Sequence, residues 1–273
     1  MQEHLTSPHP LTGRAAALLP HMLTAATRAA DLIATRADQR GDLEWRVKAH
    51  ADFVSDVDMA AERIIRETLA EYVPDSKVMG EELSPDSAPG AGVHFIVDPL
   101  DGTTNFLHGY PEYAVSIALV LDGALSAGVV RNAATGECFT ACIGAGAERD
   151  GARISVSSNT DPARALVGTG FPFRSFTHVK RYLRQFENVS RATSGIRRAG
   201  SAALDLCDVA CGRFDAFWEL QLSPWDFAAG ALIIREAGGI VTDIDGGEVP
   251  YTPSSIVAGS AALHPWLLDL LAR

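Results

Sequence analysis

The sequence lacks the features that mark membrane, nucleic-acid-binding or secreted proteins. No apolar run approaches the roughly 20 residues that cross a bilayer, and the stretch from Met1 to Arg14 has no signal-peptide pattern. Lys and Arg number 23 against 34 Asp and Glu, a net charge of −11 that argues against broad binding to nucleic acid or anionic membrane. We therefore expect a cytoplasmic protein with no membrane partner and no direct nucleic-acid partner.

Cysteine is scarce as well. Its four residues form two pairs, Cys138/Cys142 and Cys207/Cys211, each spaced by four positions. Zinc ligand pairs are usually separated by about two residues, so packing in the core is the better interpretation of both pairs. We expect reduced, buried thiols.

Several familiar catalytic motifs are also missing. The sequence has no G-x-S-x-G elbow, no GKS or GKT phosphate loop and no H-E-x-x-H helix. "GAGAERDG", from Gly144 to Gly151, does not match G-x-G-x-x-G. These absences exclude the simplest serine-hydrolase, P-loop and zinc-protease interpretations.

The chain of 273 residues is 47% hydrophobic, enough for a large core in one domain or two closely packed halves. Apolar spacing predicts helices from Arg14 to about Arg40 and from about Asp58 to Tyr72, followed by short strands and a hairpin up to about Ser157. After Asp161, strands alternate with helices, and the chain ends on a helix. The predicted class is mixed α/β or α+β, built from layers of helices and sheets.

The stretch "IVDPLDGTTNF", from Ile96 to Phe106, concentrates charge where an apolar strand ends. Asp98 follows the run "VHFIV", Asp101 can return to the same side of a turn, and Gly102 exposes backbone N–H groups. Two carboxylates so close repel each other unless a cation lies between them, and Mg²⁺ prefers such oxygen ligands. The alternative is an Asx-turn with a purely structural role.

Other acidic residues recur at the ends of predicted elements. Asp56, Asp58 and Asp226 lie at helix starts, where capping and the helix dipole also favour aspartate. Glu81, in "VMGEEL", has no such explanation, because it places a charge where a short strand should enter the core. Spacing alone does not show that these residues converge.

Together, the motifs resemble the inositol-monophosphatase superfamily of metal-dependent, lithium-sensitive phosphatases, and within it the bacterial inositol-1-monophosphatase type. The resemblance extends from about Lys48 to Gly259, with the family's order and spacing. It rests on "DFVSDVD" (Asp52 to Asp58), "GEE" (Gly80 to Glu82), "DPLDGTTNF" (Asp98 to Phe106), "RRAGSAALDL" (Arg197 to Leu206) and "PWDFAAG" (Pro224 to Gly230).

The resemblance implies a set of metal ligands. Glu81, Asp98 and the carbonyl of Leu100 would hold one Mg²⁺, and Asp98, Asp101 and Asp226 would hold a second. A third ion near Glu81 is left open, so two or three ions are expected.

The resemblance also implies catalytic roles. Thr103, with Asp58 hydrogen-bonded to its hydroxyl, would orient and deprotonate the attacking water, and Glu81 would belong to the same catalytic group. Backbone amides of Gly102 and Thr103 would bind phosphate oxygens.

For the alcohol part of a small phosphomonoester, the resemblance implies contacts from Asp101, Gly200, Ser201, Ala202 and Glu219. Glu219 has an alternative interpretation as a solvated residue at the end of a strand.

The expected reaction is hydrolysis of inositol-1-phosphate to myo-inositol and phosphate. Thr104 favours this branch, because many histidinol-phosphate and phosphoadenosine phosphatases carry lysine there. Histidinol phosphate and other sugar or nucleotide phosphates remain alternative substrates. The resemblance also puts Lys48 at the pocket entrance, where an exposed lysine without a role is the alternative.

The family fold implied for residues 1–273 is an αβαβα sandwich in a single domain. Its N-terminal α+β half would cover about 1–157 and its C-terminal α/β half about 158–273, in a homodimer. A hypothesis from another class, suggested by "RRAGSAALDL", is that the chain works mainly as a partner of the transcription machinery.

Overall fold

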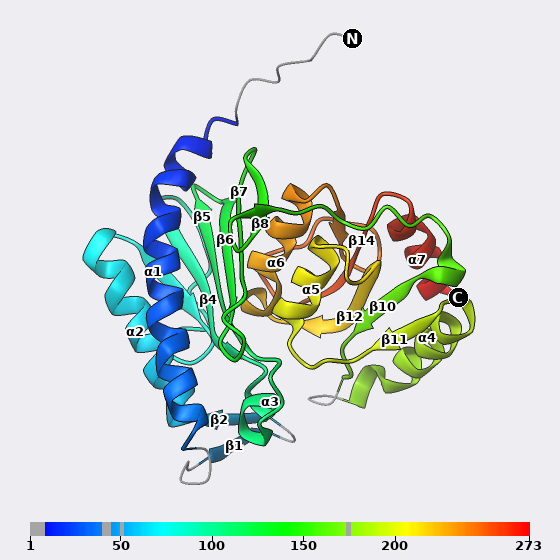
Figure 1. The fold of residues 1–273 in the computed structure, drawn as a ribbon, viewed down its shortest axis with the longest axis horizontal. Coiled ribbons are helices and arrows are strands. Elements are labelled where there is room, and N and C mark those ends of the chain that lie inside the picture. Colours follow the sequence, from blue (N-terminus) through cyan, green and yellow to red (C-terminus); the bar gives the residue numbers. More distant parts are fainter. Residues whose placement is uncertain (1–8, 40–44, 50–51, 173–175) are drawn as a thin grey trace.

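The computed structural model describes residues 9–39, 45–49, 52–172 and 176–273, with backbone alone for 45–49 and 52–55. Two β-sheets stand side by side with helices outside and between them (Figure 1). The order across the molecule is helix, sheet, helix, sheet, helix. The predicted αβαβα class is confirmed.

The larger sheet has seven strands in chain order. Its first two strands are parallel and the remaining neighbours are antiparallel. The strands are β3 (Lys77–Gly80), β4 (Val93–Asp101), β5 (Ala114–Leu121), β6 (Ala124–Asn132), β7 (Cys138–Cys142), β8 (Gly146–Arg149) and β9 (Ala152–Arg153). β8 and β9 form the predicted hairpin, and its turn residues Asp150 and Gly151 both have positive φ, as a tight two-residue turn requires.

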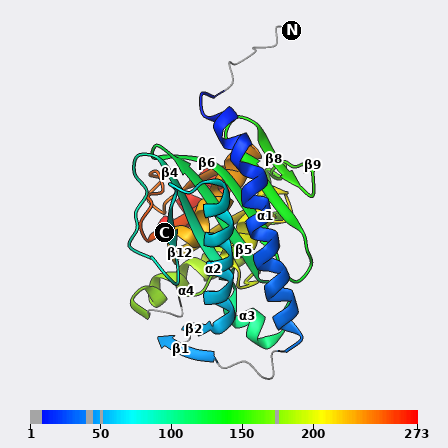
Figure 2. The same ribbon diagram turned by 90° about the vertical axis from the view of Figure 1, so that its left-hand side faces the viewer.

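The outer face of this sheet is covered by α1 (Thr12–Ala37) and α2 (Asp56–Tyr72), which lie next to each other in Figure 2. Small buried residues such as Ala25, Ala26 and Ala29 allow α1 to approach its neighbours closely. A short antiparallel pair, β1 (Trp45–Ala49) and β2 (Asp52–Ser55), connects the two helices. The side chain of Lys48 falls outside the described residues.

The second sheet has five strands in the order β11-β10-β12-β14-β13. β10 is parallel to both of its neighbours, and β14 is antiparallel to its two. The strands are β10 (Leu166–Thr169), β11 (Gly195–Arg197), β12 (Ala216–Leu222), β13 (Ile240–Thr242) and β14 (Ser254–Gly259). Its outer face is covered by α4 (Val179–Ala192) and α7 (Leu263–Ala272) (Figure 1).

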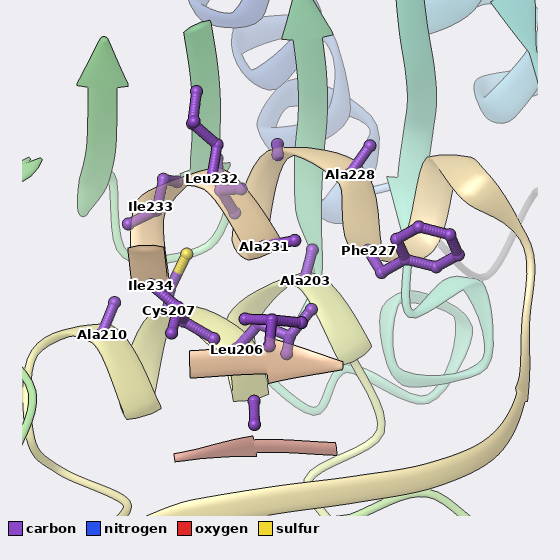
Figure 3. Packing of buried hydrophobic residues seen from close by; sticks show 14 of the residues in the cluster. Ala203, Leu206, Cys207, Ala210, Phe227, Ala228, Ala231, Leu232, Ile233 and Ile234 are labelled. Carbon is purple, nitrogen blue, oxygen red and sulfur yellow. The ribbon is translucent and has the colours of Figure 1, made fainter. Parts of the chain in front are cut away.

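The middle layer consists of α5 (Ala202–Ala210) and α6 (Pro224–Glu236). Ten of the thirteen residues of α6 are buried, because the helix is covered by a sheet on either side and by α5. Figure 3 shows apolar side chains of the two helices, Leu206 and Ile234 among them, in one shared cluster. The helices cross closely at Gly230, where an added Cβ would lie 2.7 Å from Cβ of Leu206.

All four cysteines are free, as predicted; Cys138, Cys142 and Cys207 are buried and Cys211 is partly buried. Burial raises the pKa of each thiol, that of Cys142 to about 11. Among the described residues, no helix has both the length and the apolar character that a membrane span needs.

Candidate metal and active site

The aspartates of "DPLD" lie in a β-bulge. The prediction that the strand ends at Asp98 was wrong, since β4 continues to Asp101. Asp98 pairs with Ser116 and Asp101 with Ala114, so three steps along β4 match two along β5. Residues three apart on a regular strand face opposite sides, and the extra residue restores Asp101 to the side of Asp98.

The bulge brings both aspartates to Asp226, at the start of α6. Carboxylate oxygens of Asp98, Asp101 and Asp226 all lie within 4.8 Å of one another. Asp226 also has the capping role that the sequence allowed, because its Oδ2 accepts the N–H of Ser223 at 2.7 Å. Capping and membership of the cluster are compatible.

The electrostatics of Asp98 are those of a buried acid among acids. Its side chain is 1% exposed. Burial raises its pKa well above the usual range, and the carboxyls of Glu81, Asp101 and Asp226 raise it further, while the N–H of Leu100 lowers it. Unshielded carboxylates are unfavourable in such a position.

This donor set fits a hard divalent cation. It offers only carboxylate oxygens, which Mg²⁺ prefers over nitrogen and sulfur. A cation among Asp98, Asp101 and Asp226 would replace mutual repulsion with attraction. The cluster has the composition of a metal site.

Asp101 also connects the two halves of the chain. Its Oδ2 accepts a hydrogen bond from Oγ of Ser201 at 2.6 Å and another from N–H of Ala203 at 2.8 Å. Ser201 is the N-cap of α5. The "DPLDG" and "RRAGSAALDL" motifs therefore meet at one carboxylate.

The predicted pair of Asp58 and Thr103 is in contact. Thr103 begins α3 (Thr103–His108), and its Oγ1 lies 2.9 Å from Oδ1 of Asp58 and 3.1 Å from the carbonyl oxygen of Leu100. Asp58 is 1% exposed on the inner face of α2. Gly102, the N-cap of α3, has φ 91° and turns the backbone from β4 into the helix.

Glu81 lies beside the cluster rather than inside its most compact set. It follows β3, its N–H donates to the carbonyl of Val97 at 3.2 Å, and its charge acts on Asp98. Its oxygens are not among those within 4.8 Å of one another.

A pocket with a cavity volume of about 520 Å³ opens against the cluster. The residues expected to contact the alcohol all line it: Asp101, Gly200, Ser201, Ala202 and Glu219. Asp226 lines it as well. His178, Arg198 and Ser254 extend the wall beyond the predicted residues.

Two buried carboxylates escaped the sequence predictions. Asp205, on α5, lines the pocket with 2% exposure, and among the described residues its Oδ1 has no hydrogen-bond partner. Glu62, on α2, is fully buried. The signal for Glu62 was its position four residues after Asp58, on the apolar face of the helix.

Residues 16–273 match the family model described as the inositol monophosphatase family. An inositol-1-monophosphatase of Rhizobium meliloti is 43% identical over 257 residues, which are 94% of this chain and 97% of that protein. A Nus factor SuhB of Pseudomonas aeruginosa is 44% identical over 253 residues, covering 91% of this chain and 93% of that protein.

Solved structures agree with this relationship. An extragenic suppressor protein suhB from Bartonella henselae superposes with a TM-score of 0.88 at 41% identity, over 94% of this chain and 99% of that one. An IMPase from Thermotoga maritima has a TM-score of 0.85 at 31% identity, over 94% and 97% of the chains. The chain belongs to the inositol monophosphatase family, which supports a phosphatase activity.

Proposed function

We propose that this chain is a Mg²⁺-dependent phosphomonoester hydrolase that converts inositol-1-phosphate to myo-inositol and phosphate. One observation carries the proposal: three carboxylates from β4 and α6 converge on the wall of a pocket large enough for a sugar-sized ester. The inositol-1-monophosphatase name of the Rhizobium meliloti relative favours this ester over the other candidates.

In this proposal Asp98, Asp101 and Asp226 hold one Mg²⁺, and Glu81, Asp98 and the carbonyl of Leu100 hold another. Bound there, the cations would neutralise the charge that develops on the phosphoryl oxygens and activate water as a nucleophile.

Thr103 orients the attacking water. The hydroxyl has a single hydrogen and donates it to Asp58, so an oxygen lone pair is left to take the proton of the water while the hydroxyl's own hydrogen passes to the Asp58 carboxylate. Asp58, on the inner face of α2, fixes the direction of this hydroxyl and receives its proton. Amides of Gly102 and Thr103, at the start of α3, bind phosphate oxygens.

The alcohol occupies the remainder of the pocket. Asp101 and Glu219 accept hydrogen bonds from substrate hydroxyls, and Gly200, Ser201 and Ala202 form the adjacent wall. Several polar groups around one small volume suit a polyol better than an apolar alcohol.

The proposal is tested by phosphate release from inositol-1-phosphate, histidinol phosphate, fructose-1,6-bisphosphate and phosphoadenosine phosphate. EDTA-treated protein should be inactive until Mg²⁺ is restored, and the inositol ester should be preferred. Asp101→Asn should lower the rate of phosphate release by more than about 100-fold. Mutation of a residue that only orients a metal ligand already costs about 10–100-fold, and Asp101 is a proposed ligand itself. Exposed Asp31→Asn is the matched control.

Near-native turnover by folded Asp101→Asn would refute the metal assignment. Preference for another ester would keep the metal site and replace the substrate. Inactivity on all four esters would remove the proposed reaction.

Lithium provides a separate test. Li⁺ should inhibit phosphate release at Mg²⁺ concentrations that support activity, because it competes for the same carboxylate oxygens. K⁺ at equal concentration controls for ionic strength. Indifference to Li⁺ would move the chain away from the lithium-sensitive branch.

A second candidate function is binding to the transcription machinery. It is favoured by the 44% identity to a relative named a Nus factor and by the resemblance noted at "RRAGSAALDL". Inactive Asp101→Asn protein, used as bait in cell extract, should recover RNA polymerase or an associated factor. Failure to recover either would count against this function.

We also propose that the chain forms a homodimer, as its resemblance to the family implies. Light scattering should give twice the 29.0 kDa chain mass. A monomer at micromolar concentration would contradict the proposal.

A further inference from the structure

Helix α2 presents two buried carboxylates on one face, and the proposed reaction uses only one of them. Asp58 and Glu62 are four residues apart, so they project from the same side of the helix. Their exposures are 1% and 0%. Asp58 contacts Thr103, whereas Glu62 contacts the turn at 80–84, which carries Glu81.

The carboxylate of Glu62 accepts hydrogen bonds from consecutive backbone amides of this turn. Its Oε2 lies 2.8 Å from N of Glu82, and both of its oxygens lie 3.3 Å from N of Leu83. These amides follow Glu81 directly. Glu62 therefore anchors the backbone of the turn to helix α2.

Arg66, one helical turn further along α2, contacts both the strand that precedes this turn and the last residue of the turn. Its Nε donates to Oε1 of Glu62 at 2.9 Å, and its Nη2 donates to the carbonyl of Val78 at 3.3 Å and to Oγ of Ser84. Ser84 donates in turn to the carbonyl of Val78 at 2.6 Å. The buried carboxylate of Glu62 is thus paired with Arg66 and hydrogen-bonded to two backbone amides, and both kinds of contact offset the cost of burying it.

Gly80 leaves the space that this carboxylate occupies. A Cβ at Gly80 would lie 2.1 Å from Oε1 and 2.5 Å from Cδ of Glu62. The glycine of "GEE" therefore makes room for a side chain from α2, and the first residue of the motif has a structural partner.

The turn must be held against repulsion. Glu81 acts electrostatically on Asp98, which Asp101 and Asp226 already surround. When these acids are ionised and no cation lies among them, they repel one another, which favours movement of Glu81 away from Asp98. The hydrogen bonds from Glu62 and Arg66 oppose that movement.

From these contacts we propose that Glu62 is a positioning residue that holds the 80–84 turn so that Glu81 faces the Asp98 cluster, and that it thereby sets the affinity of this site for a divalent cation. The inference rests on the metal site of the proposed function and adds a residue that does not touch the metal. Supporting groups of this kind orient ligands before the ion binds.

The test is Mn²⁺ binding to metal-free protein, followed by the electron paramagnetic resonance signal of free Mn²⁺. This readout does not depend on turnover. Glu62→Gln keeps the side-chain volume but removes the negative charge. The side chain then no longer forms an ion pair with Arg66, and it accepts the backbone N–H groups of Glu82 and Leu83 more weakly. The variant's dissociation constant for Mn²⁺ should rise about tenfold, and amide exchange in the peptide covering 80–84 should become faster.

Glu67→Gln is the matched control, because Glu67 lies on the exposed face of the same helix. It should bind Mn²⁺ as the native chain does. Native affinity in folded Glu62→Gln would overturn the proposal, even if amide exchange became faster. Equal weakening in the two variants would overturn it too, because the effect would then be the loss of any nearby charge.

If Glu62→Gln does not fold, Ser84→Ala loosens the same turn without leaving a buried charge unpaired. It should raise the dissociation constant in the same direction, and an unchanged constant would overturn the proposal. Failure of the native chain to bind Mn²⁺ at all would instead refute the proposed metal site. If the native chain binds Mn²⁺ and releases phosphate, and Glu62→Gln binds Mn²⁺ with the same dissociation constant, only the role of Glu62 is refuted.

Discussion

The hydroxyl of Thr103 connects Asp58 to the proposed reaction. Thr103→Val keeps the shape of the side chain and removes the oxygen that would accept a proton. We expect kcat to fall by on the order of 10²–10⁴-fold, the usual contribution of a positioned proton acceptor. Thr103→Ser, which keeps the hydroxyl, should retain most activity. Equal kcat values for the Val and Ser variants would remove the hydroxyl from the mechanism.

Asp205 gives a pH-dependent prediction. Burial raises its pKa well above the usual range, and Glu219 and Asp101 add to the effect. The folded state therefore keeps the proton after the unfolded chain has lost it, so stability falls as pH rises from about 4 toward the raised pKa. Each unit of the shift is worth about 1.4 kcal/mol.

Asp205→Asn removes the group whose raised pKa makes the folded state less stable as pH rises. The Tm advantage of the variant over the native chain should grow as pH rises through that interval, as measured by calorimetry on metal-free protein. Exposed Asp31→Asn should show no such trend. A constant difference across the interval would mean that Asp205 does not titrate as the structure indicates.

At the scale of residues, the sequence predicted the acids that belong to compact motifs. Asp98, Asp101 and Asp226 were identified because each motif has recognisable spacing. Glu62 and Asp205 were missed, because a single acid inside a helical pattern resembles a solvated residue until its partners are known. Their burial depends on segments distant in the chain.

At the scale of elements, the change from β4 to α3 depends on one glycine. Gly102 has φ 91°, and an added Cβ would lie 2.7 Å from the carbonyl oxygen of Glu112, a backbone atom that side-chain rotation does not move. Gly102→Ala should therefore cost about 1–3 kcal/mol for the backbone strain, with the clash adding to it. Urea unfolding measures the loss.

Gly123→Ala is the control, because Gly123 has φ 85° but nothing within 4 Å of an added Cβ. It should carry the strain of the positive φ alone, about 1–2 kcal/mol. Equal losses of unfolding free energy at the two positions would show that the contact with the Glu112 carbonyl does not contribute to the cost of Gly102→Ala.

The long elements were predictable, whereas two of the short strands, β11 and β13, were not. α2, α6 and β5 have strong apolar patterns, which predict the element without knowledge of its neighbours in the fold. β11 and β13 have three residues each and lie at the sheet edges, so their pairing depends on neighbours rather than on their own composition. The bulge in β4 is defined by its register with β5, and the sequence of β4 alone does not determine that register.

At the scale of the whole molecule, α6 packs against both sheets, so the two halves share one core. We predict a single unfolding transition. Three of the four tryptophans, Trp218, Trp225 and Trp266, lie in the C-terminal half, so tryptophan fluorescence follows mainly that half, whereas far-ultraviolet circular dichroism follows the whole chain. The two denaturation curves should coincide. Separate midpoints would show that the halves unfold independently.

The burial of the cysteines has a practical consequence. Only a thiolate attacks an alkylating reagent, and burial keeps all four thiols of this chain protonated at neutral pH. The native thiols should therefore react slowly with maleimides. One cysteine introduced at exposed Glu67 and another at exposed Leu183 should react faster than the native thiols, so a dye pair at these two positions would measure distances across the molecule.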